Sequence, residues 1–296
     1  MALPHCNRAQ QPATLRRLAL ALARYTHSRQ LDLEIGAARK VRSPNLYERY
    51  TWSSWSMAAV MNNFVGDGNG YVGNLDLEPE TAYTLSATLD WHAADRHWEL
   101  TATPFYTHVE DYIDAVPYPG TAWAPDQFNV LQYANQSARL YGIDLAGQRR
   151  LTRNTWGDWG LHAVVNLTQG TNRDSGDVLY NLMPLNGRLT LTQQRGGWDN
   201  ALEWELVASK DDGSEVRNEL KTAGYGLVHL RGSHRWGQVR LDLGVENLFD
   251  HRYDLPTGGA YLGQGTTMSI NAPSTAWGSA VPGMGRSLYA GVTVSF

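Results

Sequence analysis

The feature that most constrains the fold of this chain is a two-residue alternation of apolar and polar side chains. In the segment YTLSATLDW, residues 83–91, every odd position is apolar or aromatic and every even position is polar. Because successive side chains of a β-strand point to opposite faces, this pattern predicts a strand with one apolar and one polar face. The pattern recurs in LDLEIGA (31–37), WELTATPFYTH (98–108), LYGIDLAG (140–147), LHAVVNLT (161–168), GRLTLTQ (187–193), ALEWELVA (201–208), VRLDLGVE (239–246) and SLYAGVTVSF (287–296). We therefore expect an all-β chain of about ten antiparallel strands.

Composition excludes several classes of protein. The formal net charge is −4 and charged residues make up only 18% of the chain. The chain therefore lacks a basic surface for nucleic acid, and we expect no nucleic-acid partner. It contains no run of about 18 apolar residues, so no membrane-spanning helix is expected. Alternating strands leave two architectures open: a sandwich, whose apolar faces meet in a core, and a transmembrane barrel, whose apolar face meets lipid.

The lengths of the connections favour the barrel. Short turns near AADRH (93–97), TRNTWGD (152–158), RGGWD (195–199) and SHRWG (233–237) alternate with long polar or glycine-rich connections at 43–79, 114–129, 171–184, 210–220 and 248–285. Outer-membrane barrels have this asymmetry, with tight turns at the periplasmic end and large loops outside. Six tryptophans lie near the short turns, as an aromatic girdle at the membrane interface requires: Trp91, Trp98, Trp156, Trp159, Trp198 and Trp236.

Three groups of residues carry a resemblance to a known family. They are KVRSPNLYERY followed by GNLDLEPETAY, then GVENLFDHRYDLP, and the terminal GRSLYAGVTVSF. In these groups the chain resembles TonB-dependent outer-membrane receptors. The residues that match the family motifs are Pro44, Asn45, Gly73, Asn74, Leu77, Pro79, Glu80, Asn247, Leu248, Phe249 and Asp250. The resemblance implies that Pro44 and Asn45 follow an outgoing strand. The five residues from Gly73 to Glu80 then open the returning strand, and the four residues 247–250 precede the last external loop.

The same resemblance implies a location, partners and a kind of function. Phe296 matches the terminal aromatic residue through which the barrel assembly machinery recognises outer-membrane proteins. The location implied is the outer membrane of a Gram-negative bacterium, and the partners implied are membrane lipid and that machinery. The function implied is transport by a receptor, so no enzyme is expected.

Glycine-rich loop segments narrow the resemblance to the branch of TonB-dependent copper receptors. They are MNNFVGDGNGYVGN, LPTGGAYLGQGTTMSI and VPGMGRS. The resemblance implies copper as a transported ligand and no resident cofactor. Thioether and imidazole groups suit Cu(I), and the candidate ligands in the predicted external loops are Met57, Met61, His251, Met268 and Met284. For each of these residues, packing against a neighbouring loop is the alternative.

The resemblance covers only part of such a receptor. The family has a plug domain, a TonB box and a barrel of about 22 strands, whereas residues 31–296 match about the last ten strands. Residues 1–30 resemble no part of the family, and we expect a non-homologous or disordered segment there. TonB would act only through a plug that is missing here, so energised import is not expected of this polypeptide alone.

Two other functions remain open on the sequence. A small passive porin of about ten strands requires residues 31–38 to pair with residues 287–296, which an even number of strands permits. A soluble adhesin or binding sandwich requires the apolar faces to form a core. Glu203 and Glu205 share one face of a strand, but a solvated pore wall explains them better than a pair of glycosidase carboxylates.

Overall fold

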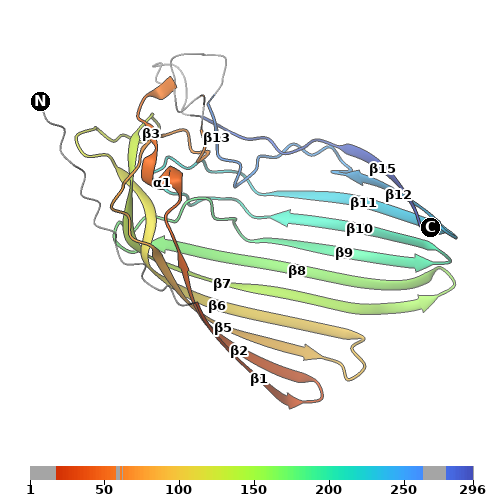
Figure 1. Cartoon of the computed structure of the whole chain (residues 1–296). Coiled ribbons are helices and arrows are strands. Elements are labelled where there is room, and N and C mark those ends of the chain that lie inside the picture. Colours follow the sequence, from red (N-terminus) through yellow and green to blue (C-terminus); the bar gives the residue numbers. More distant parts are fainter. Residues whose placement is uncertain (1–17, 58–60, 62, 263–277, 296) are drawn as a thin grey trace, which may run out of the picture.

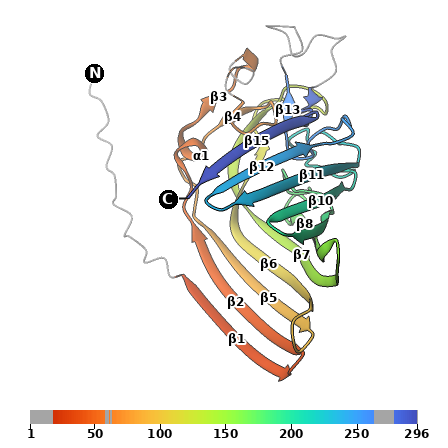
Figure 2. The same cartoon turned by 90° about the vertical axis from the view of Figure 1, so that its right-hand side faces the viewer.

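The computed structural model describes residues 18–57, 61, 63–262 and 278–295. Its main feature is an antiparallel sheet in which eleven strands are successive neighbours. They are β1 (Ala19–Ser28), β2 (Leu31–Arg42), β5 (Glu80–His92), β6 (Trp98–Pro117), β7 (Val130–Asn154), β8 (Gly157–Asn172), β9 (Asn186–Arg195), β10 (Trp198–Val207), β11 (Tyr225–Trp236), β12 (Val239–Glu246) and β15 (Ser287–Val294). Figures 1 and 2 show that these strands form a curved wall. The predicted all-β antiparallel fold is confirmed.

The connections are sorted by length between the two ends of the wall. Tight turns at 29–30, 93–97, 155–156, 196–197 and 237–238 lie at one end, on the right in Figure 1, and the long connections lie at the other. Tryptophans gather at the short-turn end. The rings of Trp91 and Trp98 lie 4.9 Å apart there, and His234 contacts both Trp198 and Trp236. The asymmetry predicted from the connection lengths is confirmed.

The first strand of the wall contradicts one prediction. β1 lies inside the segment 1–30 that we expected to be non-homologous or disordered, and it pairs with β2 along its length. For residues 19–28 the prediction is wrong. Its physical reason is that the LALALA run places small or large apolar side chains on both faces, so the apolar and polar alternation that marks the other strands is lacking.

The two faces of the wall differ in chemistry. On the outward face, apolar side chains stay accessible, among them Leu85 at 58% and Leu89 at 44% exposed. On the inward face, hydroxyl groups pair across strands, as Thr88 and Thr103 do at 3.0 Å. This arrangement agrees with an outward surface that lipid covers and a polar interior. No helix among the described residues is long and apolar enough to cross a membrane.

The closure that a small porin would need is absent from the described residues. β2 pairs with β1 on one side and with β5 on the other. It therefore has no free edge for β15, so the pairing of residues 31–38 with 287–296 that the porin alternative requires does not form. Within the described residues, β1 and β15 each pair on one side only.

The buried core lies at the long-loop end, in what we call the loop platform: the described residues of the connections at 43–79, 118–129, 173–185, 208–224 and 247–286. This platform contains α1 (Leu46–Tyr50), β3 (Trp52–Ser53), β4 (Gly70–Val72), β13 (Ala260–Tyr261) and β14 (Ser279–Ala280). β4 pairs in parallel with the start of β7 and thereby joins the platform to the wall. One apolar cluster, where residues of the platform pack against the platform ends of β6 and β7, is almost inaccessible to water: Tyr71, Leu77, Ile113, Ala115, Leu131 and Tyr133.

Replacing Leu85 by arginine tests the assignment of the outward face. If lipid covers this face, Leu85→Arg should lower the free energy of unfolding by about 2–4 kcal/mol, because the guanidinium loses water near the bilayer midplane. Ser86→Arg, one residue away on the inward face, should change it by less than about 1 kcal/mol. Urea unfolding in phospholipid vesicles, followed by tryptophan fluorescence, measures both. Equal effects of the two substitutions would contradict the assignment.

Candidate functional site

The first motif builds one helical turn at the start of the loop platform. The side chain of Asn45 accepts a hydrogen bond from the backbone N–H of Glu48 at 2.8 Å, and the Glu48 carboxylate accepts one from the backbone N–H of Asn45 at 2.8 Å. This reciprocal capping box satisfies two N–H groups that would otherwise lack partners at the start of α1. Pro44 directly precedes the cap and has no N–H of its own to satisfy.

Arg42 ties this helical turn to the returning strand. Its guanidinium donates to both oxygens of Glu80, at 2.5 and 2.8 Å, and to Glu48 at 2.9 Å. Bidentate contacts of this kind are among the strong ion pairs, because both of their hydrogen bonds join charged groups in a fixed geometry. Glu80 also accepts from the backbone N–H of Ile113 at 2.8 Å. The motif residues therefore fasten the ends of β2, β5 and β6 to α1.

Four further motif residues fit the returning chain closely against its neighbours: Gly73, Asn74, Leu77 and Pro79. A Cβ at Gly73 would lie 2.5 Å from the backbone of Arg49, so a side chain has no room there. The Asn74 side chain donates to the carbonyl of Tyr133 at 3.1 Å. Leu77 is 3% exposed within the apolar cluster. These motif residues thus shape the platform.

The second motif holds the last long connection. Asn247 is 2% exposed and has a φ of 51°, a left-handed conformation that asparagine tolerates better than most residues. Its side chain donates to the carbonyl of His251 at 2.8 Å and to the carbonyl of Met284 at 3.3 Å. Asp250 accepts from the backbone N–H of Arg286 at 2.8 Å. The two limbs of the connection are therefore tied together where they leave β12 and approach β15.

The other two residues of this motif have different surroundings. The backbone N–H of Leu248 donates to the carbonyl of Val228 at 2.7 Å, which extends the pairing of β11 past the end of β12. Phe249 is 73% exposed.

The structure brings two of the five predicted metal ligands together. His251 and Met284 are held through their backbones by the same Asn247 side chain, and both side chains are exposed. A thioether and an imidazole are thus presented to solvent from the two limbs of one connection. Such a pair can act as soft and borderline ligands of a metal ion.

Of the remaining predicted ligands, Met61 lies near a contact between the first and last long connections. Met61 is 75% exposed, and two residues further on the side chain of Asn63 donates to the carbonyl of Ala260 at 3.1 Å. Met57 is partly buried in the same first connection. Met268 and the terminal Phe296 lie outside the described residues.

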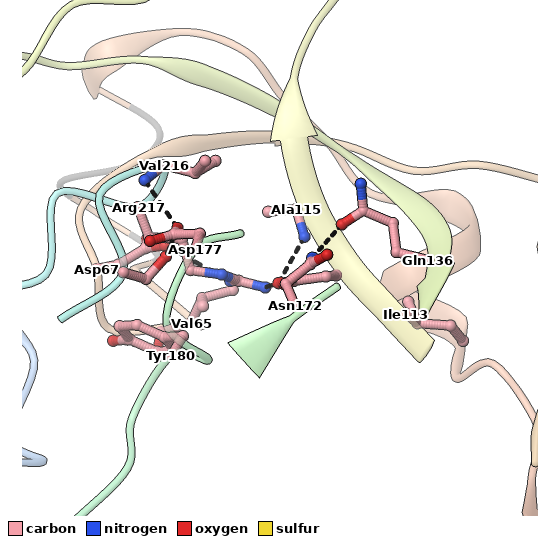
Figure 3. A network of polar contacts seen from close by, with 12 residues as sticks. Val65, Asp67, Ile113, Ala115, Gln136, Asn172, Asp177, Tyr180, Val216 and Arg217 are labelled. Atoms are coloured by element: carbon pink, nitrogen blue, oxygen red, sulfur yellow. Dashed lines mark hydrogen bonds and ion pairs between the residues drawn. The ribbon is translucent and has the colours of Figure 1, made fainter. Parts of the chain in front are cut away.

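The centre of the platform is a buried charge network that the sequence did not indicate. Arg217 is 6% exposed, and its guanidinium donates to Asp114 at 2.9 Å and to the hydroxyl of Tyr71 at 2.7 Å. Asp67 lies 3.7 Å from the same guanidinium and accepts a hydrogen bond from Tyr71. Figure 3 shows Arg217 between Asp67 and Asn172, and the guanidinium carbon lies 5.1 Å from the ring centre of Tyr180.

Electrostatics keep two members of this network, Arg217 and Tyr71, each in one ionisation state. Burial works against the charged form of Arg217, but Tyr71, Asp114 and Asp67 outweigh it and hold the pKa of Arg217 well above its usual value. Burial likewise raises the pKa of Tyr71 well above that of a free phenol. Arg217 therefore stays charged and Tyr71 stays a neutral hydrogen-bond donor throughout the physiological pH range.

A third carboxylate, that of Asp177, extends the network to the neighbouring loop. Asp177 accepts from the hydroxyl of Ser214 at 2.7 Å and from the backbone N–H groups of Glu215 and Val216 at 2.9 and 3.1 Å. Asn172 donates to Asp114 at 2.9 Å. The network thus joins three long connections, at 43–79, 173–185 and 208–224, to the ends of β6 and β8. Its central residue, Arg217, lies 146 and 103 positions from its partners Tyr71 and Asp114 in the sequence.

Removing the guanidinium of Arg217 tests whether this network holds the loops of the platform together. Arg217→Met leaves two carboxylates buried without their cation, so we expect a loss of about 3–5 kcal/mol in the stability of the platform. Arg286→Met removes an exposed contact, 3.9 Å from Asp250, and should cost about 0–1 kcal/mol. Amide hydrogen exchange of residues 63–72 and urea unfolding measure the two losses. Unchanged exchange rates in Arg217→Met would show that the network does not hold the loops.

Comparison with known proteins identifies the family. Residues 15–248 match the family model described as TonB dependent receptor-like, beta-barrel. The match includes residues 15–30, so the expectation that this stretch lies outside the family is wrong. The heme/hemopexin utilization protein C of Haemophilus influenzae is 28% identical over 264 residues, which cover 82% of this chain and 35% of that protein. The chain thus spans about a third of the length of the curated relatives it matches.

Solved structures of receptors share the fold. The copper transporter OprC has a TM-score of 0.73 and 23% identity, covering 94% of this chain and 40% of that chain. The ferric enterobactin receptor PfeA of Pseudomonas aeruginosa has a TM-score of 0.66 and 19% identity, with 94% and 40% covered.

These matches agree with the geometry of the wall, its short-turn end and its loop platform. TonB-dependent receptors are outer-membrane transporters of Gram-negative bacteria and not enzymes, as predicted. The chain belongs to the TonB-dependent receptor family, of whose β-barrel it forms a part.

Proposed function

We propose that this chain supplies part of the barrel wall and external loops of a receptor that binds copper before import. The observation that carries the proposal is the contact of one side chain, Asn247, with the backbones of both His251 and Met284. The contact holds one imidazole and one thioether on neighbouring limbs of the last long connection. Both groups suit Cu(I), which prefers soft ligands.

Contacts between the first and last long connections support a larger ligand set. Asn63 donates to the carbonyl of Ala260, and the backbone N–H of Ala260 donates to the carbonyl of Gly66 at 2.7 Å. Met61 lies beside this contact in the sequence, and Met268 follows Ala260 by eight positions. We include Met57, Met61 and Met268 as further candidate ligands. The fold shared with the copper transporter OprC also supports copper.

The other parts of the mechanism belong to the whole receptor. We propose that TonB acts through a plug domain, that lipid covers the outward face of the wall, and that the barrel assembly machinery recognises Phe296. The loop platform would then bind the ligand, and movement of the plug would open the path along the polar inward face.

A receptor for heme is the second candidate. It is favoured by the curated relatives, which are heme/hemopexin utilization proteins with 28% and 27% identity. In that case His251 is the candidate axial ligand, because imidazole is a common ligand of heme iron. The two candidates make different predictions for Met284.

Copper binding is tested by competition with a chromogenic Cu(I) chelator under reducing conditions. Met284→Leu and His251→Gln should each lower the affinity for Cu(I) at least about tenfold. Loss of even a residue that only supports a metal ligand lowers metal affinity by about 10- to 100-fold. Met183→Leu is the matched control, since Met183 packs against the apolar cluster of Val207, Tyr225 and Leu227 and lies outside the candidate set. It should bind Cu(I) like the unchanged protein.

Titration with hemin separates the two candidates. A Soret band that His251→Gln abolishes and Met284→Leu preserves, together with weak Cu(I) binding, would favour the heme receptor. Equal Cu(I) affinity in all three variants would refute the ligand roles of His251 and Met284.

A further inference from the structure

Three side chains at the short-turn end of the wall form a cluster that the loop platform and its ligands do not involve. Asp32 lies at the start of β2, and Asp90 and His92 lie at the end of β5. Asp32 and Asp90 are direct partners in the register of the two strands, so their side chains share the inward face. Two like charges placed directly opposite each other destabilise a sheet. Their juxtaposition therefore needs a compensating positive charge.

The orientation of His92 is fixed by the backbone. Its Nδ1 atom lies 2.9 Å from the carbonyl oxygen of Ala93. Because a carbonyl only accepts hydrogen bonds, Nδ1 carries the proton, and in the neutral ring Nε2 is left with a free lone pair. Nε2 lies 3.6 Å from the Oδ2 atom of Asp32. A lone pair thus faces a carboxylate, at a distance too long for a hydrogen bond.

The cluster also gathers buried polar atoms that lack hydrogen-bond partners. His92 is 7% exposed, and its Nε2 atom has no hydrogen-bond partner. The Oδ1 atoms of Asp32 and Asp90 are buried and unpartnered in the same way. Leaving one such atom unsatisfied costs about 1–3 kcal/mol, and more when the group is charged. Three in one place indicate a missing positively charged partner.

The charged neighbours compensate these carboxylates only in part. Arg96 lies 3.5 Å from Asp90, but it is half exposed and lies closer, at 3.1 Å, to Glu99. Arg24 lies 3.6 Å from Glu34. The remaining neighbour of Asp32 in the register is Thr26 of β1, whose hydroxyl is uncharged.

We propose that Asp32, Asp90 and His92 bind a divalent transition-metal ion, of which Zn²⁺ is the representative. One ligand atom from each residue lies within 4.8 Å of the other two, so small side-chain movements would bring them to the separation of about 3.3 Å that tetrahedral ligands at about 2.0 Å from one zinc ion have. Two carboxylates and one imidazole are a ligand set that zinc accepts, with a fourth position open to water or another group. The hydrogen bond from Nδ1 to a carbonyl is the usual outer-shell support of a metal-bound histidine.

The ion would act as a clip at the short-turn end. It would neutralise the two opposed carboxylates and join the β1–β2 hairpin to the β5–β6 hairpin at their turns, where the backbone N–H of His92 already donates to the carbonyl of Gln30 at 2.9 Å. This site is independent of the copper proposal, because it lies at the opposite end of the wall.

Metal titration of the whole chain in detergent micelles tests the site. The probes are Co²⁺, whose visible absorption reports its ligands, and Zn²⁺, which should displace it at one equivalent. Asp90→Asn and His92→Gln should each lower the affinity for Zn²⁺ at least about tenfold. Asp242→Asn is the control, because Asp242 is paired with Arg240 at 2.8 Å on another strand, and it should bind Zn²⁺ unchanged.

Measurements of stability distinguish the loss of the metal site from the failure of a variant to fold. Without metal, Asp90→Asn should unfold at a higher urea concentration than the unchanged chain, since it removes one of two opposed charges. Zn²⁺ should stabilise the unchanged chain and Asp242→Asn, but neither Asp90→Asn nor His92→Gln. Equal Zn²⁺ affinity in all variants, or a Co²⁺ spectrum that His92→Gln leaves unaltered, would overturn the proposal.

Discussion

A strand that crosses a bilayer must give its backbone N–H and C=O groups to neighbouring strands, because lipid offers no other partner. The wall meets this condition with an unbroken series of antiparallel pairings from β1 to β15. At one irregularity of the ladder, a side chain completes it. The register of β6 and β7 shifts between Val109 and Tyr112, and the amide of Asn135 donates to the carbonyl of Asp111 in that bulge at 2.7 Å.

Beyond the long ends of the strands, side chains take over the role of the ladder. Asn45 caps α1, and Asn74 and Asn247 each donate to a backbone carbonyl of a neighbouring segment. The Arg217 network joins further loops of the platform. Burying these charges costs desolvation energy, so the network contributes more to a single defined loop arrangement than to overall stability. A platform fixed in this way can present exposed side chains such as Met284 at defined positions.

The sequence predicted the parts of the fold that depend on local periodicity. Strands such as β5 and β12 follow from the two-residue alternation, and the placement of the turns follows from the lengths of the connections. β1 could not be predicted in this way, because its leucines and alanines leave no polar face. Nor could the sequence place Arg217 beside Asp67 and Asp114, since loop residues far apart in the chain carry no periodic signal.

The candidate sites could likewise be predicted from the sequence only in part. Residue types and the resemblance pointed to His251 and Met284, but only the structure shows that Asn247 holds both. The juxtaposition of Asp32 with Asp90 depends on the register of β2 and β5, and a shift of one residue would turn one of the two carboxylates to the other face.

Within the described residues, β1 and β15 form the two edges of the wall, and their directions limit how a barrel can close. Eleven strands that alternate in direction begin and end with strands that run the same way, so β1 and β15 both point toward the short-turn end. Joining these edges directly would force a parallel seam into an otherwise antiparallel sheet. An antiparallel barrel built on this wall therefore takes an odd number of additional strands, and a barrel of about 22 strands takes about eleven.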